Sequence, residues 1–180
     1  MTTTHATSRW VGRAVWVEQR LFEVVGGWVA TTTDDEATAA IASLSRHHAW
    51  RADVLAELLS TYGGTAPDDH GAGPEAAVEA GLVLLADLPS DVDRLAGLAR
   101  SVLPRLVVAH DGFLADASPV SGRPAVRLVT VARDDLVADW RRVEALLQRR
   151  AAPADVGAML AAVERLEGRL ADAGGILGRP

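Results

Sequence analysis

The feature that most constrains the fold is a recurring spacing of apolar residues. In the first segment they are spaced four, three, four, three and four positions apart, at Trp10, Ala14, Val17, Leu21, Val24 and Trp28. Because an α-helix turns once every 3.6 residues or so, this spacing keeps one helix face apolar. The spacing recurs at about 35–61, 90–117, 125–150 and 153–173. The sequence therefore predicts an all-α protein built from amphipathic helices.

The boundaries of these segments carry residues typical of helix ends. Thr33 or Asp34 can cap the helix expected at 35–61, and Ser90 can cap the helix expected at 90–117. Pro104 lies inside the latter and has no N–H to donate, so we expect a kink that is relieved locally. A short apolar helix is expected at about 75–87.

Composition indicates one globular domain over residues 1–180, with a bundle core at about 8–150 and a C-terminal helix at about 153–173. Apolar residues make up 49% of the 180 positions, which is enough for a sizeable core. The absence of cysteine excludes disulfides, thiolate metal sites and a cysteine nucleophile. All 18 basic residues are arginine, which is typical of a GC-rich, bacterial genome.

Charge and hydropathy argue against two classes of partner. The net charge is −6 and the acidic residues are spread along the chain, so we expect no binding to nucleic acid. No run of 18 apolar residues occurs, so we expect no membrane span. The N-terminal residues lack the apolar segment of a signal peptide, which favours a cytoplasmic location.

The order of the segments resembles a known family. Two helical pairs with short links are separated by nearly thirty residues, an arrangement that forms a four-helix bundle with a crossover. EQRLFEVVGGWV (Glu18–Val29) and LSRHHAWRADVLAELL (Leu44–Leu59) are similar to the first helical pair of the ferritin-like superfamily. The resemblance implies an antiparallel four-helix bundle, a long crossover with a short helix, and an added fifth C-terminal helix.

The resemblance also implies where metal ligands would lie. Catalytic members hold two metal ions with a Glu from one helix and a Glu-x-x-His pair from the next, in each half. Glu18 and His48 match the first Glu and the His, but Ser45 stands where the pair needs Glu. In the second half, His110 stands where a carboxylate is expected, and the helix with Asp134 has no His. The resemblance therefore implies the fold with an incomplete ligand set.

Several polar residues lie on or beside the expected apolar faces: Glu18, His48, Arg51, His110, Arg133 and Asp134. A lone buried charge costs several kcal/mol, roughly, so we expect these residues to meet and compensate one another. One interpretation is a salt-bridge network in which Arg51 or Arg133 takes the volume of an ion.

Two other interpretations stay open for the same residues. The first is a metal site for iron or manganese made by Glu18, His48, His110 and Asp134, although the nearby arginines oppose a cation. The second is a pocket for a small anionic ligand, with the arginines and histidines as donors. His47 points about 100° away from His48 on a helix and is expected at the surface or flank.

The sequence favours a non-catalytic ligand-binding or protein-interaction module without a cofactor. The tryptophans and the apolar fifth helix suggest a homodimer. The alternative is a metal-dependent oxidoreductase with atypical His and carboxylate ligands. A third class is an acid–base enzyme that uses His48 or His110 without metal, because histidine titrates near neutral pH.

Overall fold

The computed structural model describes residues 4–61, 76–118 and 122–177, and in these ranges every regular element is a helix. The elements are α1 (Thr4–Trp28), α2 (Asp35–Thr61), α3 (Ala76–Ala86), α4 (Asp91–Gly97), the π-helical turn η2 (Leu98–Val102), α5 (Leu103–Asp116), α6 (Arg123–Arg150), the 3₁₀ turn η3 (Pro153–Asp155) and α7 (Val156–Asp172). The predicted all-α class is confirmed. None of these helices is both long and apolar enough to cross a bilayer.

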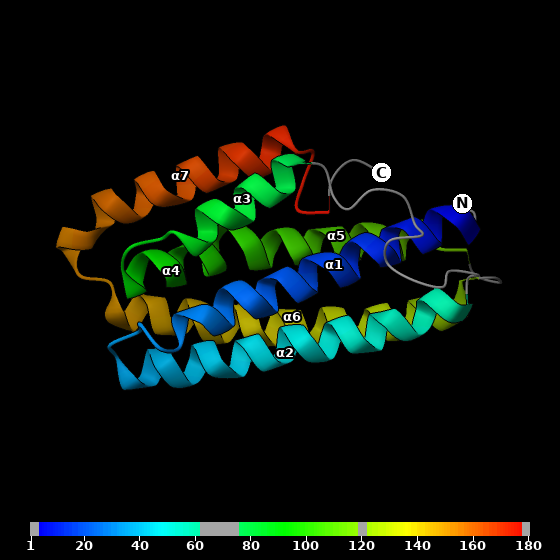
Figure 1. Ribbon diagram of the computed structural model, residues 1–180, viewed down its shortest axis with the longest axis horizontal. Coiled ribbons are helices and arrows are strands. Elements are labelled where there is room, and N and C mark those ends of the chain that lie inside the picture. Colours follow the sequence, from blue (N-terminus) through cyan, green and yellow to red (C-terminus); the bar gives the residue numbers. More distant parts are fainter. Residues whose placement is uncertain (1–3, 62–75, 119–121, 178–180) are drawn as a thin grey trace.

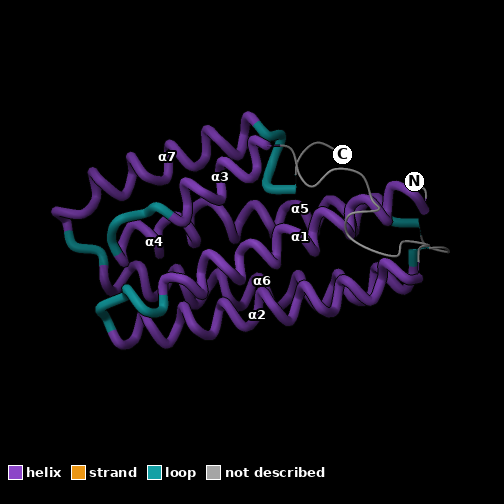
Figure 2. The backbone as a smooth tube through the Cα atoms, viewed as in Figure 1, coloured by secondary structure: helices purple, strands orange, loops and turns teal. Residues whose placement is uncertain are grey.

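The long helices lie side by side, with α3 and α7 along one flank (Figure 1). Helix α1 packs against α2, α5 packs against α6, and α2 packs against α6. In Figure 1, α1 and α6 run in one direction, while α2 and the continuous run α4–η2–α5 run in the other. The tube in Figure 2 shows this run without a break at η2. Helix α7 packs against α3 and α4, so it lies outside the long helices.

Two helix starts are fixed by the caps that the sequence predicts. The Asp34 carboxylate accepts the Ala37 N–H at 2.8 Å at the start of α2. The Ser90 hydroxyl accepts the Asp93 N–H at 3.1 Å at the start of α4. Each bond satisfies an amide that has no partner within the first helical turn. The short helix of the predicted crossover is present as α3, whereas residues 62–75 lie outside the described ranges.

Pro104 is accommodated by a π-helical turn. The N–H of Leu103 donates to the Leu98 carbonyl, five residues earlier. If this pattern continued, the N–H of residue 104 would donate to the Ala99 carbonyl, but Pro104 has no N–H. The indole N–H of Trp140 on α6 donates to the Ala99 carbonyl instead, at 2.7 Å. The local relief expected at the proline therefore comes from a neighbouring helix.

The apolar core is formed by faces of all the long helices, and on α6 that face differs from the predicted one. The spacing of Val129, Arg133, Leu136, Trp140 and Val143 predicts that Arg133 and Trp140 lie on the inner face of α6. The buried positions along this helix are Ala125, Val129, Ala132, Leu136, Asp139, Val143, Leu146 and Leu147, whereas Arg133 and Trp140 are only partly buried. Both sets follow a three-four spacing, and the set with Ala132 leaves the guanidinium of Arg133 near solvent, where its charge costs less.

Candidate functional site

The centre of the polar core is Arg51 on α2, whose side chain is 0% exposed. Its Nε donates to Glu18 Oε2 at 3.2 Å. Its Nη1 donates to Asp139 Oδ2 at 2.9 Å and also to Asp135. One guanidinium thus joins carboxylates from α1 and α6. We call this cluster the Arg51 network, and its members are Glu18, His47, His48, Arg51, Asp135 and Asp139.

Short sequence spacings bring these side chains together. His48 and Arg51 are three residues apart on α2, and Asp135 and Asp139 are four apart on α6. Residues at these spacings share one face of a helix. Glu18 faces them from α1 and is itself completely buried. The network therefore lies where three helices meet, and no polar member depends on a loop.

Glu18 is ionised and bound to His48. Burial acts to raise the pKa of Glu18, but the charge of Arg51 and the interaction with His48 outweigh burial and lower it to about 2. The carboxylate can therefore only accept, and it accepts from His48 Nδ1 at 2.6 Å. The same nitrogen lies 2.9 Å from Arg51 Nη2. Because Nδ1 carries a proton toward Glu18, it cannot also accept from Arg51.

His110 on α5 is buried close to the network. Its Nδ1 donates to the Leu106 carbonyl at 2.8 Å, and its ring lies edge-on to Trp10 with centroids 5.2 Å apart. Burial lowers the pKa of both His48 and His110, although the Glu18 charge acts in the opposite direction. Burial therefore favours the neutral form of both rings.

Within the described part of the chain, three buried atoms of this region have no hydrogen-bond partner: Glu18 Oε1, His48 Nε2 and His110 Nε2. In both histidines the proton sits on Nδ1, so each Nε2 presents a lone pair. Unpartnered buried polar atoms are rare, and water or an ion often explains them.

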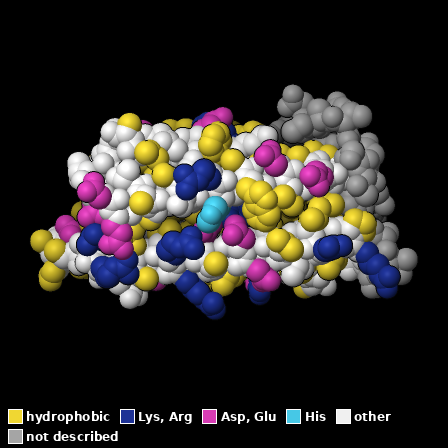
Figure 3. All heavy atoms as spheres, turned by 90° about the horizontal axis from the view of Figure 1, so that it is seen from below, with side chains coloured by type: hydrophobic (Ala, Val, Ile, Leu, Met, Phe, Trp, Pro, Cys, Tyr) yellow, Lys and Arg dark blue, Asp and Glu magenta, His cyan; other side chains and the backbone are white. Residues whose placement is uncertain are grey.

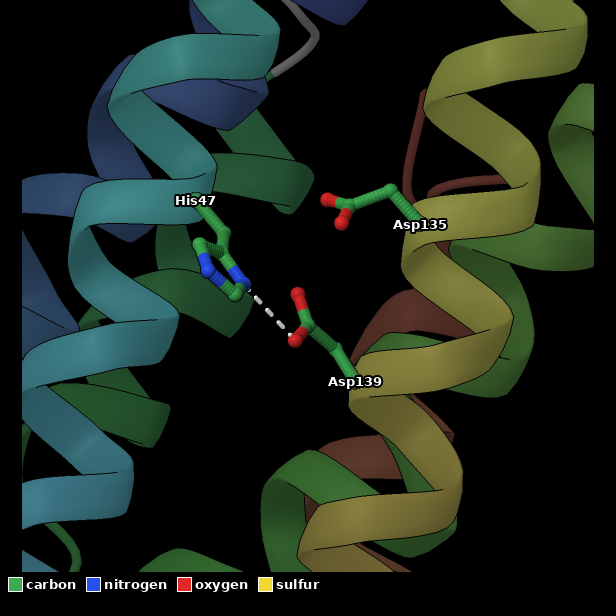
Figure 4. Close-up of side chains that lie close together, drawn as sticks. All are labelled: His47, Asp135 and Asp139. Atoms are coloured by element: carbon green, nitrogen blue, oxygen red, sulfur yellow. Dashed lines mark hydrogen bonds and ion pairs between the residues drawn. The ribbon is translucent and has the colours of Figure 1, made fainter.

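The ligand atoms do not fit a dimetal centre. Among the described residues, the group whose ligand atoms all lie within 4.8 Å of one another is His47, Asp135 and Asp139, and it does not include Glu18 or His48. Figure 4 shows His47 of α2 facing the two aspartates of α6, with His47 Nδ1 at 2.8 Å from Asp139 Oδ1. Arg51 already binds both aspartates, so a cation there would be repelled.

Ser45 shows why the Glu-x-x-His pair is not completed. Its hydroxyl donates to the Phe22 carbonyl of α1 at 3.0 Å. A Cβ added at Gly26 of α1 would lie 2.9 Å from the Ser45 oxygen, so the two helices approach closely here. A glutamate at this position would meet the α1 backbone, because the Ser45 side chain points toward α1.

Two of the predicted cluster residues lie elsewhere. Arg133 is half-exposed and pairs with Asp111 at 2.9 Å and with Asp134 at 2.8 Å, both of them exposed. The structure thus places Arg133 and Asp134 at the surface, because the buried face of α6 is offset from the predicted one. Glu18, His48 and Arg51 come together, and His110 is buried next to them.

Sequence reasoning missed Asp135 and Asp139. Asp139 lies between Leu136 and Val143 at spacings of three and four, a signal that it shares their buried face. His47 has a side chain that is 35% exposed, as a flank position implies, yet it binds Asp139. Figure 3, which views the molecule of Figure 1 from below, shows a histidine at the surface next to acidic and basic side chains.

Comparisons with protein-family models, with curated proteins and with solved structures find no match for this chain. The functional proposal therefore depends on the geometry of the Arg51 network and of the surfaces around it.

Proposed function

We propose that this protein is a ferritin-like four-helix bundle with a degenerate dimetal site, and that it acts as a non-catalytic ligand-binding module. The observation that carries the proposal is the buried guanidinium of Arg51, which bonds to Glu18, Asp135 and Asp139. A permanent side-chain cation stands where carboxylates from both helical pairs converge. Its positive charge balances part of their negative charge without a metal ion.

The burial of the two core histidines supports a non-catalytic role. His48 and His110 are each 0% exposed, so neither ring meets solvent in the structure. A general acid or base must come within hydrogen-bond reach of its substrate. The third class from the sequence, an acid–base enzyme that uses His48 or His110, therefore has less support than a binding module.

The polar core is also a poor site for a small anion. Arg51 directs Nε and Nη1 at carboxylates, and Nη2 lies next to His48. Arg133 lies outside the core and pairs with two surface aspartates. Two nitrogens of the fully buried Arg51 therefore already bind carboxylates and Arg133 is distant, so the ligand of the module is expected to bind elsewhere.

A metal-dependent oxidoreductase with iron or manganese is the second candidate. It is favoured by the three buried atoms without partners, on Glu18, His48 and His110. Metal-binding histidines commonly donate Nδ1–H to a carboxylate or a carbonyl, as these two do. Asp134, the fourth predicted ligand, is exposed and cannot belong to this set.

A homodimer is the assembly we propose. Several large apolar side chains are exposed, and they are Phe22, Trp50, Val83, Val108, Val131, Val156 and Leu160. Light scattering coupled to size-exclusion chromatography should give twice the chain mass, and Trp50→Glu should lower it toward one chain. A single-chain mass for the unaltered protein would contradict the dimer. The cytoplasmic location stays a prediction.

Metal titration followed by thermal unfolding tests the non-catalytic proposal. We expect Mn²⁺ or Fe²⁺ (added anaerobically) to leave the midpoint unchanged, because Arg51 already binds the carboxylates of the core and repels a cation at the His47 group. A rise in the midpoint that His48→Gln abolishes and His47→Ala preserves would contradict the proposal. It would instead favour the oxidoreductase.

A further inference from the structure

A cavity of about 740 Å³ lies apart from the Arg51 network. It is bounded by the first turns of α1, by α5 and by the C-terminal end of α7, which runs toward α1 in Figure 1. Small-molecule sites commonly have volumes of roughly 300–1,000 Å³ and mostly apolar linings. The size of this cavity is thus suited to a small organic ligand.

Most of the cavity wall is apolar. On α5, the lining includes Pro104, Val108 and Gly112, and Val108 is 69% exposed. Trp10 of α1 stacks on Phe113 of α5 with ring centroids 4.3 Å apart, and both residues line the cavity. A ligand that covers Val108 would remove apolar surface from water, which is the main favourable term in binding of this kind.

The charged residues that line the cavity are Arg9, Arg100, Arg105, Asp116 and Glu167, and Asp116 has an interaction of its own. Arg105 is neutralised by Glu167, with Nη2 at 2.7 Å from Oε2 and Nε at 2.9 Å from Oε1. Arg100 pairs with Glu144 at 2.6 Å. Arg9 also lines the cavity and is exposed, and it makes no hydrogen bond or ion pair with the described part of the chain. The lining therefore offers an apolar body next to an available positive charge.

We propose that this cavity binds a single-chain amphiphile that carries a carboxylate. The apolar chain lies along α5 against Val108 and Gly112, and the carboxylate meets Arg9. A cationic head would face Arg9 with a like charge, and a neutral head would leave the guanidinium unpaired. The inference rests on the proposed ligand-binding function and identifies its site, but it requires nothing of the Arg51 network.

Calorimetric titration with three probes of equal chain length tests the head-group preference. Decanoate, decanol and decyltrimethylammonium should bind in that order of affinity at low salt. An exposed ion pair of this kind is worth about 3- to 5-fold in affinity, so decanoate should exceed decanol by that factor. Arg9→Gln should reduce the affinity for decanoate to that for decanol, and should leave decanol unchanged. Equal affinities for decanoate and decanol in the unaltered protein would overturn the proposal.

A variant whose side chain fills the cavity tests the location of the proposed ligand site. A Cβ at Gly112 meets no atom within 4 Å, so Gly112→Leu should fold and place its side chain in the cavity. We expect at least about a 10-fold loss of affinity for decanoate and for decanol. Gly157→Leu is the matched control, because Gly157 on α7 is equally unobstructed and does not line the cavity.

The outcomes separate this inference from the proposed function. If no probe binds, or if Gly112→Leu binds decanoate as well as the Gly157→Leu control does, the cavity assignment is wrong. A protein free of metal would in that case still agree with the non-catalytic function. Binding to phosphatidylglycerol vesicles that survives Gly112→Leu would move the amphiphile to a membrane surface and would also overturn the inference. Bound metal, by contrast, would count against the non-catalytic function and would leave the cavity assignment standing.

Discussion

Substitution of Arg51 by methionine should strongly destabilise the protein. Methionine keeps a flexible apolar stem of similar length, but it leaves the fully buried Glu18 without its cation. Removing one partner of a buried ion pair typically costs about 3–5 kcal/mol. Asp135 has a side chain that is 29% exposed and can turn to water, and Asp139 keeps His47 and Arg142 as partners, so Glu18 accounts for most of the loss. With a urea m-value of about 2 kcal/mol/M, the unfolding midpoint should fall by roughly 1.5–2.5 M.

The pH dependence of this loss follows from Glu18. In the unaltered protein the pKa of Glu18 is lowered to about 2, so its contribution to stability is present at pH 7 and is lost as the pH falls from about 4.5 toward 2. Without Arg51, burial raises the affinity of the Glu18–His48 pair for a proton. The folded variant then gains a proton before the unfolded chain does, and its deficit relative to the unaltered protein should shrink from pH 7 to pH 5.

Two variants complete this test by urea unfolding. Adding Glu18→Gln to Arg51→Met removes the uncompensated charge, so the double variant should recover a large part of the lost stability. Arg133→Met is the matched control, because its guanidinium pairs with aspartates at the surface, and its midpoint should stay close to that of the unaltered protein. A change below about 1 kcal/mol in Arg51→Met would refute the assignment of Arg51 as the structural cation.

Three further predictions concern backbone contacts and the buried histidines. Trp140→Phe should cost about 1–3 kcal/mol in urea unfolding, because it leaves the buried Ala99 carbonyl without a donor. Adding Pro104→Ala should recover part of this loss, because residue 104 then has an N–H to donate. Equal losses with and without Pro104→Ala would contradict the account of the π-turn. Gly27→Ala should stabilise the protein by about 0.5–1 kcal/mol, because alanine favours a helix and the added Cβ meets no atom within 4 Å. Gly26→Ala should destabilise it, because the added Cβ would lie 2.9 Å from the Ser45 oxygen. Equal effects of the two substitutions in thermal unfolding would contradict this packing. Burial lowers the pKa of both core histidines, so the unfolded chain takes up protons before the folded chain does below about pH 6.5. Stability should therefore fall by up to about 1.4 kcal/mol per pH unit for each ring as the pH decreases. A urea midpoint that stays constant between pH 7.5 and 5.5 would contradict this.

The sequence predicts the helices well because their signals are local. The apolar spacing in α1 and the full span of α2 agree with the structure, and Asp34 and Ser90 cap the helices they were expected to cap. Each of these features depends on residues within one or two turns of each other. No information about neighbouring helices is needed to predict them.

The composition of the polar core is less predictable, because it depends on the rotation of one helix against others. Val129, Leu136 and Val143 belong to both the predicted and the observed buried face of α6, but the observed face extends toward Ala132 and Asp139 rather than toward Arg133 and Trp140. Periodicity allows either side, and the choice depends on the partners that α2 offers to Asp139. The bond from Trp140 to the π-turn and the charge balance around the cavity are likewise set by residues distant in the sequence.

Elemental analysis of the untagged protein tests the central claim most directly. The claim is that Arg51 supplies the positive charge of the core, so protein purified from cells grown with added iron and manganese should contain far less than one metal ion per chain. The His48→Ala variant should show the same content. One or two iron or manganese ions per chain in the unaltered protein, lost in His48→Ala, would contradict the claim and would establish the core as a metal centre.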